Sequence, residues 1–317
     1  MSRLLAQAAL LAAMPQAFID PLLAPGRNAI QSSAGEARGE RTLLTMPAVR
    51  PGGISVVKVV GVGSRGLSSH MLVFDPDGGL LAVIEAHQLT ARRTAAASVL
   101  AARAVGAGSA RQLAIIGAGR QAYAHVEAFA AALPLDALAI WARRSEAAEA
   151  LADFARGFVP RVRVAPSPGD AVKGAQIISC VTASRAPLIH GGMIAAGAHV
   201  DLVGGFRPNM READDTLMAR AAVVIDTPVA LEEAGDLLAP IASGALDRGS
   251  ILTLADILSG RALAPGREVT VFKSVGHAGE DLVAAELLLE RLGLLDCPAT
   301  ASGHTEELDL GGAVHHA

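Results

Sequence analysis

Cysteine, aromatic residues and charged residues are all scarce in this 317-residue sequence, which holds 2 Cys, 1 Trp, 1 Tyr and 18% charged residues. Cys180 and Cys297 are too few for a disulfide scaffold, and their separation does not match the spacing of metal ligands. We therefore expect no metal site. Reduced cysteines are typical of a cytoplasmic protein.

Long apolar runs and basic blocks are missing as well. No stretch approaches about 18 apolar residues without a charge or a turn residue, which argues against a transmembrane span. The net charge is −4, which argues against nucleic acid or an anionic membrane as the main partner. Residues 3–14 weakly resemble a short signal sequence, but the single Arg3, the internal Gln7 and a poor cleavage region favour an amphipathic first helix.

Hydrophobic residues make up 51% of the chain, and the length favours about two domains. The first part is predicted to be an antiparallel β unit, because the turn signals Pro51–Gly53 and Asp75–Gly79 separate short apolar runs. The polar segment 28–41 is predicted to be a hairpin or a loop, and Thr90 to be the N-cap of a long helix that ends at Val105. The four predicted strands are Leu43–Met46, Ile54–Val62, His70–Phe74 and Leu80–Glu85.

A strand, a glycine turn and a helix are predicted in direct succession after residue 112. Leu113–Ile116 has the length and β-branched content of a strand, and Gly117–Gly119 connects it to an alanine-rich helical segment. Gly117 permits a tight turn, Gly119 lets a pyrophosphate approach the backbone, and Ala122 allows close packing of the helix on the strand. The alternative is an ordinary βα turn, but this context favours a dinucleotide site with phosphates at the helix N-terminus.

The next strand indicates which dinucleotide is bound. Leu138–Ala142 reads as the second strand, and Arg143, Arg144 and Ser145 follow it where an NAD-binding domain usually has Asp or Glu. Guanidinium groups match the oxygens of a 2′-phosphate, whereas cations are the wrong sign to stabilise a helix N-terminus. A solvated basic helix start is the alternative. The pattern favours NADP(H).

Strands and helices alternate from Leu113 to Ser274, and the predicted strands are continuous apolar runs, as in buried parallel sheets. We therefore predict an α/β fold. Residues 112–276 are predicted to form a Rossmann-type domain with a doubly wound parallel sheet, and this domain is predicted to bind NADP. A β-rich N-terminal domain, residues 1–111, is joined by residues 277–317, where Asp281–Leu292 is predicted to be helical.

Three strings of residues stand out: Leu89–Ala97 (LTARRTAAA), Ile116–Ala122 (IGAGRQA) and Phe272–Asp281 (FKSVGHAGED). The segments Met46–Ala48, Val57–Val59 and Val203–Glu212 accompany them. Together they resemble the ornithine cyclodeaminase/mu-crystallin family, with similarity from Leu43 to Leu292. The resemblance implies a homodimer whose β-rich domains form the interface and the substrate pocket, with the nicotinamide reaching in from the Rossmann domain.

The resemblance also implies roles for single residues. Lys58 matches the active-site lysine of the family, and Arg93 matches an arginine that binds the substrate carboxylate. A second family arginine precedes the Met-Pro-Ala strand; Arg27 fits it best, and Arg41 is the alternative. Asp281 has two interpretations, a catalytic or nicotinamide-site residue, or an acid that stabilises a helix N-terminus. For Lys58 the alternative is a charge on an edge strand that faces water.

The predicted dinucleotide contacts follow from the glycine turn, the strand ends and the family resemblance. Thr94 matches a threonine that contacts the cofactor in the family. The complete set is Thr94, Gly117, Ala118, Gly119, Arg120, Gln121, Ala142, Arg143, Arg144, Thr182, Ala183, Ser184, Val203, Gly204 and Ser274.

Two departures from the family pattern bear on the reaction. Cyclodeaminases of the family carry an aspartate after the Gly-Gly of the fifth strand, where this chain has Phe206, which cannot transfer protons. They usually also carry an acid where this chain has Arg143. We therefore expect NADPH-dependent reduction of cyclic ketimine carboxylates, 1-pyrroline-2-carboxylate to L-proline and 1-piperideine-2-carboxylate to L-pipecolate. The alternatives are an NAD-dependent ornithine cyclodeaminase, an alanine-type amino-acid dehydrogenase, or a non-catalytic NADPH-dependent ligand-binding protein.

Overall fold

The computed structural model describes residues 5–33, 40–64, 66–295 and 307–308. The chain divides into two compact units: unit 1 comprises residues 1–93 and 277–317, and unit 2 comprises residues 94–276. This division falls inside helix α3 (His87–Ala104), ahead of the boundary expected at residue 112. Cys297, which figured in the cysteine argument, lies outside the described residues.

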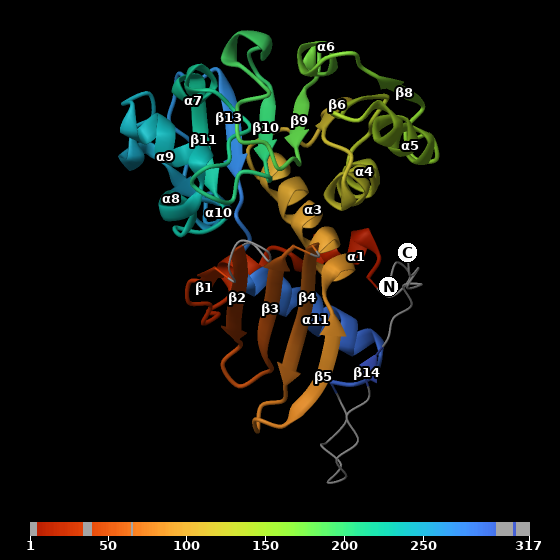
Figure 1. Cartoon of the computed structure of the whole chain (residues 1–317), viewed down its shortest axis with the longest axis vertical. Helices are drawn as coiled ribbons and strands as arrows, with labels where there is room; N and C mark the ends of the chain where they lie inside the picture. The colour runs from red at the N-terminus through yellow and green to blue at the C-terminus, as the bar shows by residue number, and fades with distance from the viewer. Residues whose placement is uncertain (1–4, 34–39, 65, 296–306, 309–317) are drawn as a thin grey trace. The chain divides into compact units, whose positions relative to one another are not determined.

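Unit 1 is built on one six-stranded sheet with the order β1-β2-β3-β4-β5-β14 (Figure 1). Strands β1 to β5 pair antiparallel, and β14 adds parallel to β5. The hairpin interpretation of the polar segment near residue 30 is confirmed, because β1 pairs with β2. The strands are β1 (Asn28–Ser33), β2 (Glu40–Val49), β3 (Ser55–Gly63), β4 (Gly66–Phe74), β5 (Leu80–Glu85) and β14 (Glu307–Leu308).

Helix α11 (Ala278–Arg291) packs against β2 and β3, on one face of this sheet. The strands alternate accordingly: Val56 and Val60 are buried, whereas Val57 and Val59 on the opposite face are only half-buried. An ion pair joins α11 to the residue that follows β2, because Arg50 Nη2 donates to Glu286 Oε2 at 2.8 Å. The short helices α1 (Gln7–Ala13) and α2 (Gln16–Ile19) also contact α11.

Two predicted helix starts were wrong by about one turn. Thr90 is not an N-cap, because α3 already begins at His87 and the amide of Thr90 donates to Ala86 O. Helix α11 begins at Ala278, before Asp281, and its N-cap is His277. In both cases the residue just before the helix lacks the side chain that normally marks an N-cap in a sequence.

Unit 2 contains an eight-stranded parallel sheet with the order β12-β11-β13-β10-β9-β6-β7-β8. Strand order reverses between β6 and β9, so this is the topological switch point at which doubly wound sheets bind their ligands. The predicted fold class is confirmed. The strands are β6 (Gln112–Ile116), β7 (Ala137–Trp141), β8 (Arg161–Val164), β9 (Ile177–Cys180), β10 (His199–Leu202), β11 (Ala221–Ile225), β12 (Leu252–Thr253) and β13 (Val269–Lys273).

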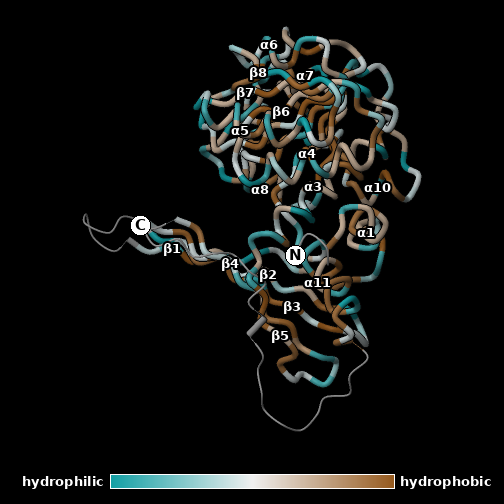
Figure 2. The backbone as a smooth tube through the Cα atoms, turned by 90° about the vertical axis from the view of Figure 1, so that its right-hand side faces the viewer, coloured by the Kyte–Doolittle hydropathy of each residue, from teal (hydrophilic) through white to brown (hydrophobic). Residues whose placement is uncertain are grey.

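The two outer strands, β8 and β12, were absent from the sequence prediction. Strand β8 alternates arginine with valine, and β12 has two residues, so neither forms the apolar run that marks a buried strand. The inner strands are almost fully buried, and Figure 2 shows hydrophobic residues along the interior of this unit. Among the described residues, no helix is both long enough and apolar enough to span a bilayer. The helices of unit 2 after α3 are α4 (Arg120–Ala132), α5 (Ser145–Ala155), α6 (Pro168–Val172), α7 (Asp215–Arg220), α8 (Ala230–Glu233), α9 (Gly235–Ala242) and α10 (Leu254–Leu258).

Candidate active site

The predicted glycine turn joins β6 to α4 as expected. Gly117 has φ 120°, and a Cβ there would lie 2.7 Å from Val181 O, so both conformation and space require glycine. Ala122 in the first turn of α4 is fully buried, which fits its expected packing role. Gly119 differs, because a Cβ there would meet nothing within 4 Å. Protein packing therefore does not require glycine at this position, and the space beside it is compatible with the ligand approach predicted from the sequence.

The N-terminus of α4 has no side-chain cap among the described residues, although Ala122 N donates to Gly119 O. Gly119 is the N-cap and makes no side-chain capping bond, so a side chain does not take up the first-turn N–H groups. Oε1 of Gln121 is buried and has no hydrogen-bond partner among the described residues. A cofactor hydroxyl could satisfy this oxygen. The turn therefore fits a dinucleotide diphosphate.

The other predicted dinucleotide residues follow the carboxyl ends of neighbouring parallel strands, so they lie along one edge of the sheet. Backbone bonds tie these ends together: Gly117 N donates to Trp141 O, and Val203 N donates to Cys180 O. Arg143 and Arg144 are exposed after β7. Thr94 is buried on α3. The strand-end residues are Ala142 to Arg144 after β7, Thr182 to Ser184 after β9, Val203 and Gly204 after β10, and Ser274 after β13.

A buried cluster of four charged side chains forms the candidate substrate site in unit 1. Lys58 Nζ donates to Asp281 Oδ2 at 2.6 Å, and Arg93 Nε donates to Asp281 Oδ1 at 2.9 Å. Arg93 Nη1 also donates to Glu280 Oε2 at 2.7 Å. Lys58 is 2% exposed and lies on β3, inside the sheet, so the alternative of a water-facing edge charge is wrong.

Burial and pairing shift the proton affinities of this cluster in opposite directions. Burial lowers the pKa of Lys58 to about 8, against the opposing effect of the Asp281 carboxylate. Burial alone would raise the pKa of Asp281, but Arg93 and Lys58 hold it below its ordinary value. Burial likewise opposes the charged form of Arg93, yet Asp281 and Glu280 raise its pKa. The cluster therefore holds an ammonium that can release a proton beside a carboxylate that stays ionised.

The register of the sheet separates the two candidates for the second arginine. Lys58 pairs with Met46 on β2, and β1 starts at Asn28 opposite Thr45. Arg27, which immediately precedes Asn28, is therefore close to the level of Lys58 and two strands away, roughly 10 Å. Arg41 lies five positions along β2 from Met46, roughly 17 Å away at about 3.3 Å per residue. The backbone geometry favours Arg27.

Sequence reasoning missed Glu280 and a second buried charged group in unit 2. Glu280 could have been found as half of an acidic pair next to the expected helix start. The second group is Glu212, Asp236 and Lys273, which are fully buried around the ends of β9, β10 and β13. Lys273 lies in a strand, and Glu212 ends the segment Val203–Glu212 that resembles the family. No charged partner was predicted for either residue.

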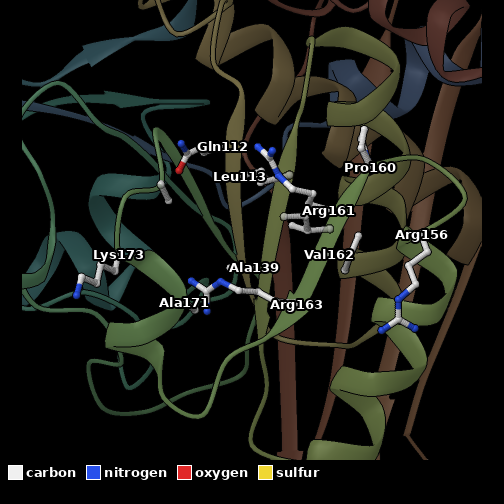
Figure 3. Close-up of a pocket in the computed structure, with 13 residues that line it drawn as sticks. Gln112, Leu113, Ala139, Arg156, Pro160, Arg161, Val162, Arg163, Ala171 and Lys173 are labelled. Atoms are coloured by element: carbon white, nitrogen blue, oxygen red, sulfur yellow. The ribbon is translucent and has the colours of Figure 1, made fainter.

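A cavity of about 500 Å³ lies elsewhere in unit 2 (Figure 3). It is lined at the amino ends of β6, β7 and β8 by residues that include Gln112, Ala137 and Arg161. The predicted dinucleotide residues follow the opposite, carboxyl ends of the same strands. The cavity contains none of the predicted site residues, so it is not the candidate cofactor site.

The chain is similar to known proteins over most of its length. A model of the ornithine cyclodeaminase/mu-crystallin family matches residues 28–293. Ketimine reductase mu-crystallin of Mus musculus is 40% identical over 235 residues, 73% of this chain and 72% of that protein. Delta(1)-pyrroline-2-carboxylate reductase of Paracoccus denitrificans is 40% identical over 237 residues, 72% of this chain and 75% of that protein. The structure of the Thermococcus litoralis Delta(1)-pyrroline-2-carboxylate reductase, in complex with NADH and L-proline, superposes with a TM-score of 0.85 at 27% identity, covering 92% of this chain and 94% of that one.

Proposed function

Because the chain belongs to the ornithine cyclodeaminase/mu-crystallin family, we propose that it is an NADPH-dependent reductase of cyclic ketimine carboxylates. The predicted family is confirmed, and so is the expectation of an oxidoreductase, the class to which the named reductases belong. The proposed substrates are 1-pyrroline-2-carboxylate, reduced to L-proline, and 1-piperideine-2-carboxylate, reduced to L-pipecolate. The observation that carries the proposal is the buried Lys58–Asp281–Arg93 cluster.

The charges of this cluster fit a small imino acid. Lys58 and Arg93 are matched by Asp281 and Glu280, so the cluster is close to neutral before substrate binds. A substrate carboxylate therefore needs a further cation, and Arg27 is the arginine that the sheet register favours. Arg93 donates Nε to Asp281 and Nη1 to Glu280, which fixes the orientation of its guanidinium. The remaining Nη protons suit end-on recognition of a substrate carboxylate.

Lys58 supplies the proton in this proposal. NADPH, when bound, would supply a hydride to C2 of the C=N bond and leave as NADP+. The substrate nitrogen then needs one proton to become a secondary amine. Lys58, or a water that it orients, gives that proton, and a lysine with a pKa near 8 is well matched to the task at neutral pH. Asp281 holds the ammonium in place and remains ionised throughout.

The choice of NADPH rests on Arg143 and Arg144, which follow β7 where an acid would favour the free ribose hydroxyls of NADH. The Thermococcus litoralis relative was solved with NADH. The preference for NADPH over NADH is therefore proposed from Arg143 and Arg144 of this chain, and not from that relative.

A homodimer is part of the same proposal. It is supported by the face of the unit 1 sheet opposite to α11, which no described helix covers and where Val57, Val59 and Leu72 are only half-buried. We also expect a cytoplasmic location.

The proposal is tested by following dinucleotide absorbance with 1-pyrroline-2-carboxylate and 1-piperideine-2-carboxylate, in parallel with NADPH and NADH. Rapid oxidation of NADPH, slower oxidation of NADH and no ammonia release from ornithine with NAD are expected. Ammonia release from ornithine would support a cyclodeaminase instead. Tight NADPH binding with no turnover of either imine would support the ligand-binding alternative.

A further inference from the structure

Glu212 holds the backbone at the ends of two adjacent strands of the unit 2 sheet. Its Oε1 accepts from both the amide and the hydroxyl of Thr182, each at 2.7 Å. Its Oε2 accepts from the amide of Gly204 at 2.7 Å. Thr182 follows β9 and Gly204 follows β10, so one fully buried carboxylate joins two loops of the predicted dinucleotide site. Both strands lie on the opposite side of β6 from β7, after which the 2′-phosphate is expected, so these loops are expected to contact the nicotinamide half.

These contacts change the interpretation of the strand-end residues. A Cβ on Gly204 would lie 1.8 Å from Thr182 O and 2.5 Å from Glu212 Oε1, so glycine is needed there for protein packing. The hydroxyl of Thr182 is also occupied, because it donates to Glu212 and accepts from Ser184 N at 3.2 Å. The hydroxyl proton of Thr182 is therefore not available to a ligand, and both residues serve to place the backbone.

A second layer of buried charges holds Glu212. Asp236 Oδ1 accepts from the amides of Glu212 and Ala213 at 2.8 and 3.0 Å. Asp236 Oδ2 lies 3.5 Å from Lys273 Nζ, which also donates to Leu202 O at 3.0 Å. The network therefore joins the ends of β9, β10 and β13. It contains the carboxylates of Glu212 and Asp236 against the one ammonium of Lys273, and the buried Asp226 carboxylate acts on the same ammonium. When these acids are ionised, negative charge is left in excess.

We propose that Glu212 is a positioning residue that sets the nicotinamide end of the dinucleotide site and, through the excess negative charge of its network, favours the oxidised, cationic ring over the reduced, neutral one. This inference rests on the proposed function. A carboxylate that is shielded from water attracts a nearby cation more strongly than it would in water. Burial raises the pKa of Glu212 to about 7, against the lowering effect of Lys273, so at pH 8 the acid is largely ionised.

The test compares three ligands on the purified full-length chain at pH 8 by calorimetry: NADP+, NADPH and adenosine 2′,5′-bisphosphate, which lacks the nicotinamide. Glu212→Gln removes the charge, so it is expected to weaken NADP+ relative to NADPH on the order of tenfold. Adenosine 2′,5′-bisphosphate should bind as it does to the wild type. Glu212→Asp keeps the charge and shortens the side chain, so it should lower both dinucleotide affinities while preserving their ratio.

Asp214→Asn is the matched control. Asp214 is also a carboxylate that accepts backbone amides, from Gly191 and Leu217, but it caps α7 and does not reach the strand ends. The ratio of the NADP+ and NADPH affinities of Asp214→Asn should equal that of the wild type. An unchanged ratio in Glu212→Gln would overturn the inference, and so would a parallel loss of all three ligands that follows the loss of thermal stability.

Thr182→Val covers the case in which Glu212→Gln does not fold. It removes only the hydroxyl contact and leaves the charge in place. It should weaken NADPH without changing the affinity for adenosine 2′,5′-bisphosphate, and equal affinity for NADPH would overturn the positioning role. A wild-type chain that binds none of the three ligands would instead overturn the proposed function itself.

Discussion

Lys58 Nζ lies 2.6 Å from Asp281 Oδ2, although 223 positions separate the two residues in the sequence. The contact exists because β3 and α11 pack on each other and present a lysine and an aspartate to the same buried space. Asp281 is therefore more than a helix-terminal acid. It keeps Lys58 charged and oriented where burial alone would favour the neutral amine.

Lys58→Met should abolish most turnover and leave dinucleotide binding intact. General acid catalysis typically contributes about 10²- to 10⁴-fold, so kcat on a cyclic imine should fall within that range. NADPH affinity, measured by fluorescence titration, should stay within about twofold of the wild type, because Lys58 belongs to unit 1. The control is Lys173→Met, an exposed lysine after α6, which should behave as the wild type. Wild-type turnover in Lys58→Met would exclude the proposed role.

The pH dependence of kcat/KM should report the same lysine. Its pKa is lowered to about 8, so Lys58 carries the proton below that pH and loses it above. A proton donor is active in its protonated form, so kcat/KM should fall about tenfold per pH unit above pH 8. In Lys58→Arg the guanidinium stays protonated over this pH range. The remaining kcat/KM of this variant should therefore not fall above pH 8. If kcat/KM fell at the same pH in the wild type and in Lys58→Arg, the fall would report ionisation of the substrate and not of Lys58.

Local features of the site could be predicted from the sequence, whereas long-range pairings could not. The β6–α4 turn is readable because Gly117 and Ala122 act within one short segment, on neighbours that any βαβ unit supplies. The partner of Lys58 could not be predicted, because no pattern in β3 indicates which residue, 223 positions away, it will contact. The same reason hid Glu212, whose contacts reach Thr182 across 30 positions. Arg27 and Arg41 could be separated only once the register of β1 and β2 was known.

Coenzyme preference should change with Arg143. Removing a charged hydrogen bond to a phosphate costs about 1.5–3 kcal/mol, so Arg143→Ala should raise the KM for NADPH roughly 10- to 100-fold. The KM for NADH should hardly change, because NADH has no 2′-phosphate. Steady-state kinetics with both coenzymes measures this.

The matched control for Arg143 is Arg156→Ala. Arg156 is another exposed arginine, and it lines the cavity at the amino ends of the strands. Both KM values should be unchanged in this variant. If Arg156→Ala rather than Arg143→Ala weakened NADPH, the dinucleotide would have been placed at the wrong end of the sheet.

The face of the unit 1 sheet opposite to α11 should be the surface through which two copies associate. Val57 and Val59 sit in the middle of that face on β3, half-buried by their own sheet and opposite to the side that α11 covers. Val59→Glu would place a carboxylate where apolar surface is buried on association, and the desolvation of an unpaired charge opposes the contact. Sedimentation equilibrium should therefore show a dimer for the wild type and a monomer for Val59→Glu. Phe158→Glu adds the same charge at an apolar residue of unit 2 that is 46% exposed, and this variant should remain dimeric. A wild-type monomer at micromolar concentration, or a dimer that survives Val59→Glu, would mean that this face does not carry the interface.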